Sequence, residues 1–97
     1  MIFLVLIPEK VYEELNRVFG YYEERQPGLG EKFLDDWEET MNHLEKRPFI
    51  HQLQFKKYRS LQFNKFPFLI IYKVEKESIL IYKLIHTKRN PYRRYKA

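Results

Sequence analysis

Two short stretches in the second half of the chain carry the residue types that phosphate chemistry requires. Cleavage of RNA by its own 2′-hydroxyl needs a general base, a general acid for the leaving oxygen, and cations beside the developing charge. Lys57, Arg59, His86 and Arg89 supply such groups and form the candidate catalytic set. Cationic neighbours would favour the neutral form of His86, which can accept a proton. If these side chains converge, they could form an endoribonuclease site.

His86 also fits a purely structural role. It continues a run in which Leu80, Tyr82 and Leu84 alternate with other residues along one strand. A histidine in that position could be a hydrogen-bonded residue at the end of the core rather than a catalytic base.

Arg59 has two interpretations as well. It shares a strand face with Leu61 and Phe63, and a charged group on an apolar face normally requires a partner. As a functional residue it would bind a phosphate through two parallel hydrogen bonds. As a structural residue it would pair with a carboxylate of the helices, for which the candidates are Glu31, Asp35 and Glu38.

The end of the chain mixes basic and aromatic residues and contains no acidic residue. This mixture suits contacts to phosphates with stacking on unpaired bases. It suits the carboxylates of a partner protein equally well, and a frayed chain end is a third interpretation. With a basic residue of the preceding connector, the candidate anion- or target-binding residues are Lys56, Lys88, Tyr92, Arg93, Arg94 and Tyr95.

Charge is divided unevenly between the two halves of the chain. Residues 1–47 hold 11 acidic and 6 basic side chains, a net charge of −5, whereas residues 48–97 hold 2 acidic and 12 basic ones, a net charge of +10. This asymmetry favours a polyanionic or acidic partner for the C-terminal half. A solvated surface without a partner is the alternative.

Composition limits the classes of protein that remain. The 97 residues suffice for one domain, which we expect to span residues 1–97. The absence of cysteine excludes disulfides, thiolate nucleophiles and cysteine metal sites. His43 and His51 have no mates at ligand spacing, so we expect no metal and no cofactor. The apolar residues 1–7 are too few to span a bilayer and lack a basic leader, so we expect a cytoplasmic protein without membrane contact.

Apolar patterning indicates a sheet that positions the basic residues. Residues 68–74 and 79–85 are almost continuously apolar, which is typical of strands covered on both faces. The polar residues 75–78 between them fit a hairpin loop. Residues 59–64 alternate and predict a two-faced strand. Residues 1–7 predict a buried first strand, which could pair parallel with an inner strand.

Two helices are expected between the first and second strands. Apolar residues recur every three or four positions from 11 to 22 and from 33 to 44, which gives each helix one apolar face. Pro27-Gly28 separates the helices, and so short a connection predicts an antiparallel αα-hairpin. Residues 49–57 are expected to be an irregular connector. The fold class is therefore α+β, with the order β-α-α-β-β-β and a twisted, mainly antiparallel sheet packed against an N-terminal αα-hairpin.

Several motifs in this order resemble one known family. They are QPGLG at 26–30 followed by Phe33, RSL at 59–61, KFPFLIIY at 65–72 and HTKRNP at 86–91. In combination they resemble the ParE/RelE toxin superfamily, most closely its ParE-like, plasmid stabilisation branch. Many members carry tryptophan shortly after the last proline, where this chain has Tyr92 and Tyr95.

The resemblance implies a small α+β toxin that is encoded beside an antitoxin, which wraps and neutralises it; a heterotetramer is one assembly that it allows. ParE-like members poison DNA gyrase, a topoisomerase, and are not nucleases. RelE-like members enter the ribosome and cleave mRNA. The leading hypothesis is a ParE-like gyrase toxin that is not an enzyme. The alternatives are a RelE-like endoribonuclease and a non-toxic relative that only binds an antitoxin.

Overall fold

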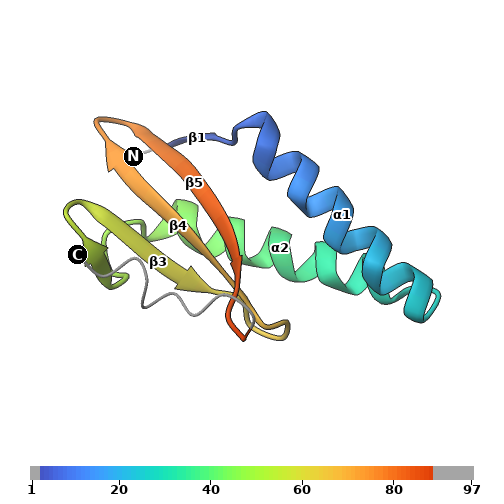
Figure 1. Ribbon diagram of the computed structural model, residues 1–97. Coiled ribbons are helices and arrows are strands. Elements are labelled where there is room, and N and C mark those ends of the chain that lie inside the picture. The colour runs from blue at the N-terminus through green and yellow to red at the C-terminus, as the bar shows by residue number, and fades with distance from the viewer. Residues whose placement is uncertain (1–2, 89–97) are drawn as a thin grey trace.

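The computed structural model describes residues 3–88, apart from the side chain of Phe55. Its elements follow the order β1 (Leu4–Leu6), α1 (Glu9–Arg25), α2 (Leu29–Lys46), β2 (Leu53–Phe55), β3 (Tyr58–Gln62), β4 (Phe68–Glu75) and β5 (Ser78–His86). The strands form one five-stranded sheet in the order β1-β5-β4-β3-β2 (Figure 1). β1 pairs parallel with β5, and the other three pairs are antiparallel. The expected α+β class and the parallel first strand are confirmed.

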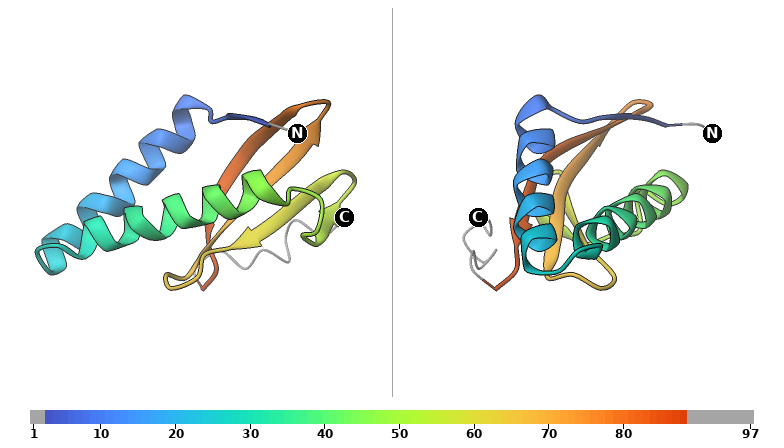
Figure 2. Two further views of the ribbon diagram at one scale, coloured as in Figure 1. Left: turned by 180° about the vertical axis from the view of Figure 1, so that it is seen from behind. Right: turned by 90° about the vertical axis from the view of Figure 1, so that its right-hand side faces the viewer.

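The two helices form the expected αα-hairpin and cover one face of the sheet. Seen from behind, α2 crosses in front of the strands, and α1 runs from the end of β1 towards the far end of the hairpin (Figure 2). Gly28 joins the helices with a φ of 89°, a left-handed conformation that glycine adopts without strain. The carboxylate of Glu23 accepts the N–H groups of Gly28 and Gly30, each at 2.9 Å, and so fixes the turn. No helix in the described part of the chain is long and apolar enough to cross a membrane.

β4 lies at the centre of the sheet and contributes to both apolar layers. Phe68, Ile70 and Tyr72 belong to the core under the helices, whereas Leu69 and Ile71 belong to a second cluster. Residues 68–72 are all buried, which confirms a strand covered on both faces over this part of the expected run, whereas residues 73 and 74 are only partly buried. The same expectation for residues 79–85 is wrong in part, because Tyr82 is 38% exposed. Tyr82 is the extra residue at a shift of register, where Ile71 pairs with Lys83 and Tyr72 pairs with Ile81.

The first strand is shorter and more exposed than expected. It covers Leu4–Leu6 at the edge of the sheet, where Leu4 is 62% and Leu6 42% exposed. Val5, between them, packs against the core. The all-apolar sequence predicted a strand covered on both faces, but the helices cover one face only, so one side of β1 faces solvent.

Residues 49–57 are not entirely irregular. They include β2, a strand of three residues that pairs antiparallel with β3 and shifts register between Leu53 and Phe55. The observed order is therefore β-α-α-β-β-β-β. Lys56 has a φ of 50° in the tight turn that joins β2 to β3.

Candidate functional site

Arg59 lies near the start of β3, at the end of the sheet closest to the C-terminus of α2. Its Nη1 donates a hydrogen bond to the backbone oxygen of His51 at 2.8 Å. Its guanidinium lies 5.7 Å from the ring centre of Phe49, which is itself 56% exposed. Arg59 therefore holds the segment that leads from α2 into β2, and its charge remains at a partly buried rim.

Within the described residues, Arg59 forms no ion pair with the helix carboxylates that were expected to be its partners. Glu31 and Asp35 lie in the first half of α2, and Glu38 lies at its midpoint. That half of α2 lies beside the other end of β3, as the hydrogen bonds from residues 64–66 to Asp36 show. The backbone of the connector lies between Arg59 and the end of α2, and its carbonyl group takes the place of the expected carboxylate.

Lys57 is the second residue of the β2–β3 turn, and its side chain reaches the β4–β5 hairpin. Its Nζ lies 3.4 Å from a carboxylate oxygen of Glu75, and Lys73 lies 3.2 Å from the same oxygen. The hydrogen bonds from Lys73 and Lys57 hold the pKa of Glu75 below its ordinary value. Lys56, at the tip of the turn, is exposed.

His86 ends β5 at the opposite end of the sheet from Arg59. Its ring packs edge-on against Phe68 at 4.9 Å, and its Nδ1 accepts the backbone N–H of Lys88 at 3.2 Å. It also lines a hollow beside α1 that includes Tyr21 and Tyr22. This setting suits a histidine that closes the aromatic core, and a functional role for His86 stays a prediction.

Arg59 and His86 are not brought together. Arg59 pairs with Tyr72 of β4 whereas His86 pairs with Phe68, so they stand two strands apart and four residues apart along the strand direction. With a spacing of about 4.8 Å between strands and a rise of about 3.3 Å per residue, their Cα atoms lie roughly 16 Å apart. Lys57 lies at the Arg59 end.

The remaining candidates fall at or beyond the end of the described chain. Lys88 is the last described residue and is exposed. Arg89, Tyr92, Arg93, Arg94 and Tyr95 lie outside the described residues.

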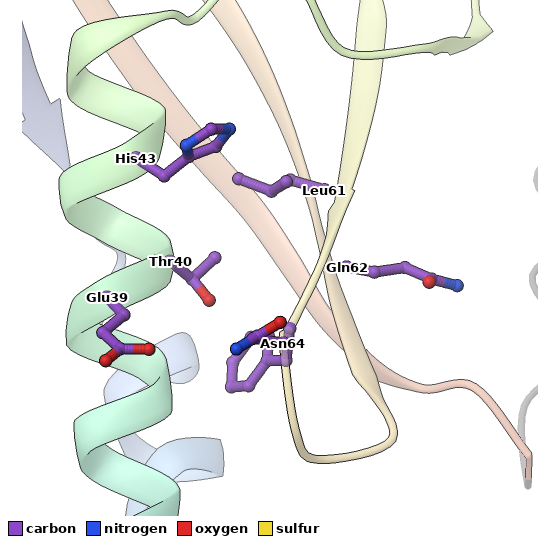
Figure 3. Close-up of a pocket in the computed structure, with 7 residues that line it drawn as sticks. Glu39, Thr40, His43, Leu61, Gln62 and Asn64 are labelled. Carbon is purple, nitrogen blue, oxygen red and sulfur yellow. The ribbon is translucent and has the colours of Figure 1, made fainter.

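A hollow of about 380 Å³ separates α2 from the end of β3 (Figure 3). Glu39, Thr40 and His43 line it from the helix, and Leu61 points towards them from the strand, whereas Gln62 points away. The position of His43 in this hollow was not foreseen. Within residues 3–88, no three histidine, cysteine, aspartate or glutamate side chains are grouped so that they could hold a metal ion.

Beside this hollow lies an unforeseen histidine pair. The ring centres of His43 and His51 are 5.0 Å apart, and Nε2 of His51 is buried without a hydrogen-bond partner. Burial lowers the pKa of His51 below 6.5, and the charges of His43 and Arg59 lower it further. Next to it, the hydroxyl of Tyr72 donates to the backbone oxygen of Pro48 at 2.7 Å, and burial raises the pKa of Tyr72. These groups fix the connector on which Arg59 also acts.

Asp36 is a second residue that the sequence reasoning missed. It is 2% exposed, and its carboxylate accepts the N–H groups of Asn64, Lys65 and Phe66 at 3.1, 2.8 and 2.9 Å. The signal was present, because Asp36 lies between Phe33 and Thr40 at the spacing of the apolar face. An acid at such a position predicts a buried partner.

An αα-hairpin laid on one face of a twisted sheet, with basic groups at both ends of the strands, is the arrangement expected from the resemblance to ParE/RelE toxins. The model of the family described as "ParE toxin of type II toxin-antitoxin system, parDE" matches residues 5–91. The chain belongs to this family. Among solved structures, the chain is similar to one described as the chromosomal ParDE TA system from P. aeruginosa, with a TM-score of 0.77 and 17% identity, over 88% of this chain and 96% of that one. That likeness concerns the fold. No curated protein sequence matches the chain.

Proposed function

We propose that this ParE-family toxin is kept inactive by a cognate antitoxin and acts in the cytoplasm by binding DNA gyrase, without cleaving RNA itself. The separation of Arg59 from His86 is the observation that carries the second half of this proposal. A nuclease needs its base, acid and cations within hydrogen-bond reach of one phosphate, about 3 Å from each group. With Cα atoms roughly 16 Å apart, Arg59 and His86 could meet one phosphate only if both side chains extended towards each other, whereas Arg59 is bonded to the carbonyl group of His51 and His86 packs on Phe68.

The engagement of Arg59 points the same way. Its Nη1 donates to the carbonyl group of His51 and its guanidinium lies against Phe49. A guanidinium that grips a phosphate through two parallel hydrogen bonds would have to present its donors outward. Because one of its donors is already bonded within the chain, we propose that Arg59 supports the connector next to it rather than a catalytic centre.

The basic half of the chain supplies a surface for a protein–DNA target. Lys56, Lys57 and Lys88 are exposed, as are two further bases, Lys65 and Lys76. Although Glu75 lies beside Lys57, the excess of positive charge in this half of the chain attracts a polyanion and accelerates its encounter. With Lys56 and Lys88, we propose as target contacts the tail residues Arg89, Tyr92, Arg93, Arg94 and Tyr95.

The test is to induce the protein in bacterial cells with and without the protein encoded in the adjacent reading frame. We expect filamentation and double-strand DNA breaks without the antitoxin, and normal growth with it. A variant that combines Arg89→Ala with Arg93→Ala should lose toxicity while it stays folded, whereas Lys32→Ala on α2 should stay toxic. Immediate arrest of translation with codon-linked cuts in mRNA would instead identify a nuclease. A soluble, folded protein that causes no growth defect would contradict both toxic activities.

A further inference from the structure

Three hydrogen bonds to the sheet fix the connector between α2 and β2. The backbone oxygens of Pro48, His51 and Gln52 accept them at 2.7, 2.8 and 3.0 Å. The donors are the hydroxyl of Tyr72, the guanidinium of Arg59 and the backbone N–H of Ser60. Phe49 and Ile50, between the first two anchors, are more than half exposed. Because few buried apolar side chains hold it, this segment should open locally at a lower free energy than the core.

His51 lies within this segment and packs against His43. Their ring centres are 5.0 Å apart, and His43 reaches from α2 towards the sheet (Figure 3). The ring centre of Tyr72, from β4, lies 6.3 Å from that of His51. Nε2 of His51 is buried and has no hydrogen-bond partner among the described residues. A charged imidazole carries a proton on both nitrogens, so Nε2 would become a buried donor without an acceptor.

The ionisable groups that face His51 also disfavour a charged ring. Arg59 of β3 donates to the backbone oxygen of His51, and His43 faces the ring from α2. Tyr72 of β4 carries no charge at neutral pH, because burial raises its pKa. Glu39, one turn before His43, lines the hollow beside it, but within the described residues it forms no ion pair with either histidine or with the arginine. The pKa of His51 accordingly lies below 6.5, because of burial first and of the charges of His43 and Arg59 next.

We propose that His51, packed against His43, is a pH-sensitive latch that holds residues 48–52 on the sheet while its ring is neutral and releases them when the ring takes up a proton. The proton comes from solvent and binds a ring nitrogen, and only hydrogen bonds break. Release lets water solvate the charged imidazole. β2 begins directly after this segment, so release also loosens the turn that carries Lys56 and Lys57. Acidification would therefore rearrange one part of the basic surface before the core unfolds.

Opening of the latch should increase as the pH falls. In the closed state the pKa of His51 is lowered, whereas in the open state the ring is in water and its pKa returns to its ordinary value of about 6.5. The open state therefore binds the proton more readily. Its population should rise below pH 6.5 by up to about tenfold per pH unit, until the closed state takes up the proton as well.

Amide hydrogen exchange of the full chain, followed by NMR, tests the latch through the N–H of Ser60, which is bonded to the connector. At pH 7.5 we expect this amide to be protected at least roughly tenfold less than the amides of residues 69–72, because it is released by local opening. Its protection factor, which corrects for the intrinsic effect of pH on exchange, should fall roughly tenfold between pH 7.5 and 5.5. Protection equal to that of residues 69–72, or protection that does not change with pH, would overturn the inference.

Variants of the three histidines of the chain separate the latch from other sources of pH dependence. His51→Gln removes the titrating ring, so the protection of Ser60 should differ by less than about twofold between pH 7.5 and 5.5. His86→Gln is the matched control, because His86 lies at the opposite end of the sheet, and it should keep the roughly tenfold fall. His43→Gln keeps the titrating ring but removes a like charge beside it, so the pKa of His51 should move up towards 6.5 and the fall should become smaller.

A folded His51→Gln variant that keeps the full pH dependence would overturn the inference, as would loss of that dependence in His86→Gln. If His51→Gln does not fold, the ring signals of His51 in the wild-type chain decide the question, together with His43→Gln, whose side chain is exposed in the fold. A pKa of His51 at or above 6.5 in the wild-type chain would overturn the inference, and so would a pKa that falls in His43→Gln.

Discussion

Replacement of Asp36 should lower the free energy of unfolding strongly even when the volume of the side chain hardly changes. Replacement by asparagine keeps the shape but removes the charge and turns one acceptor oxygen into an N–H₂ donor. Three backbone N–H groups point at the carboxylate, two of them at Oδ2. An amide nitrogen in either position would face at least one of these donors.

The magnitude follows from the contacts. A hydrogen bond to a charged group contributes about 1.5–3 kcal/mol. Asparagine keeps one acceptor oxygen, and Asn64 and Lys65 are exposed, so water can satisfy part of what is lost. We expect Asp36→Asn to lower the free energy of unfolding by about 2–3 kcal/mol, out of a total of about 5–15 kcal/mol for a domain of ordinary stability.

The loss should appear first in the loop that joins β3 to β4. This loop carries Phe63 and Phe66, and β4 begins with Phe68. All three rings pack on that of Phe33 at 5.3 to 5.7 Å between ring centres. Without the carboxylate, the loop is no longer fixed over this cluster. Hydrogen exchange of residues 64–66 should therefore rise more than that of β4.

Urea unfolding followed by circular dichroism measures this loss, and Asp35→Asn is the matched control. Asp35 is adjacent in the sequence but exposed, so its change should stay within about 0.5 kcal/mol. If Asp36→Asn were as stable as Asp35→Asn, the carboxylate would not hold the loop and the account of this turn would be wrong.

Other predictions concern buried groups and glycines. Tyr72 has a raised pKa and donates a hydrogen bond to Pro48, so stability should fall as the pH rises above 10, where tyrosine ionises in the unfolded chain but not in the folded one. Tyr72→Phe should lower the free energy of unfolding by about 1 kcal/mol at neutral pH and weaken this fall. Urea titrations at several pH values measure both effects. Because His51 has a lowered pKa, stability should fall as the pH drops below 6.5, where the unfolded chain binds a proton more readily; His51→Gln should flatten that dependence, and an unchanged slope would contradict the assignment. Gly30→Ala should lower the free energy of unfolding by about 1–3 kcal/mol, since the new Cβ would lie 2.8 Å from a backbone oxygen. Gly20→Ala has open space around it and should raise the free energy of unfolding by about 0.5–1 kcal/mol. Thermal unfolding compares the two variants.

Much of the fold could be predicted from apolar spacing alone. Val11, Leu15 and Val18 on α1, and Phe33 and Trp37 on α2, are buried as their spacing indicates. Their period reports which side of each helix must be covered, whatever covers it. Composition is less informative about strands. The residues of β1 are all apolar, yet β1 is an edge strand with one exposed face. Its exposure depends on which neighbours the topology supplies.

The candidate site was less predictable, because its geometry depends on register. Arg59 and His86 are both close to strand ends and both face the helices, yet antiparallel pairing puts them at opposite ends of the sheet. The types of the residues predict neither the register of the strands nor the hydrogen bond from Arg59 to the carbonyl group of His51.

The central claim is that this chain acts by binding gyrase rather than by chemistry of its own. Supercoiling of relaxed plasmid DNA by purified gyrase tests that claim most directly. The account predicts that the wild-type protein inhibits supercoiling, that an equimolar amount of antitoxin restores it, and that the Arg89→Ala and Arg93→Ala double variant does not inhibit. Undisturbed supercoiling at saturating protein, together with cleavage of mRNA on translating ribosomes by the same preparation, would contradict it.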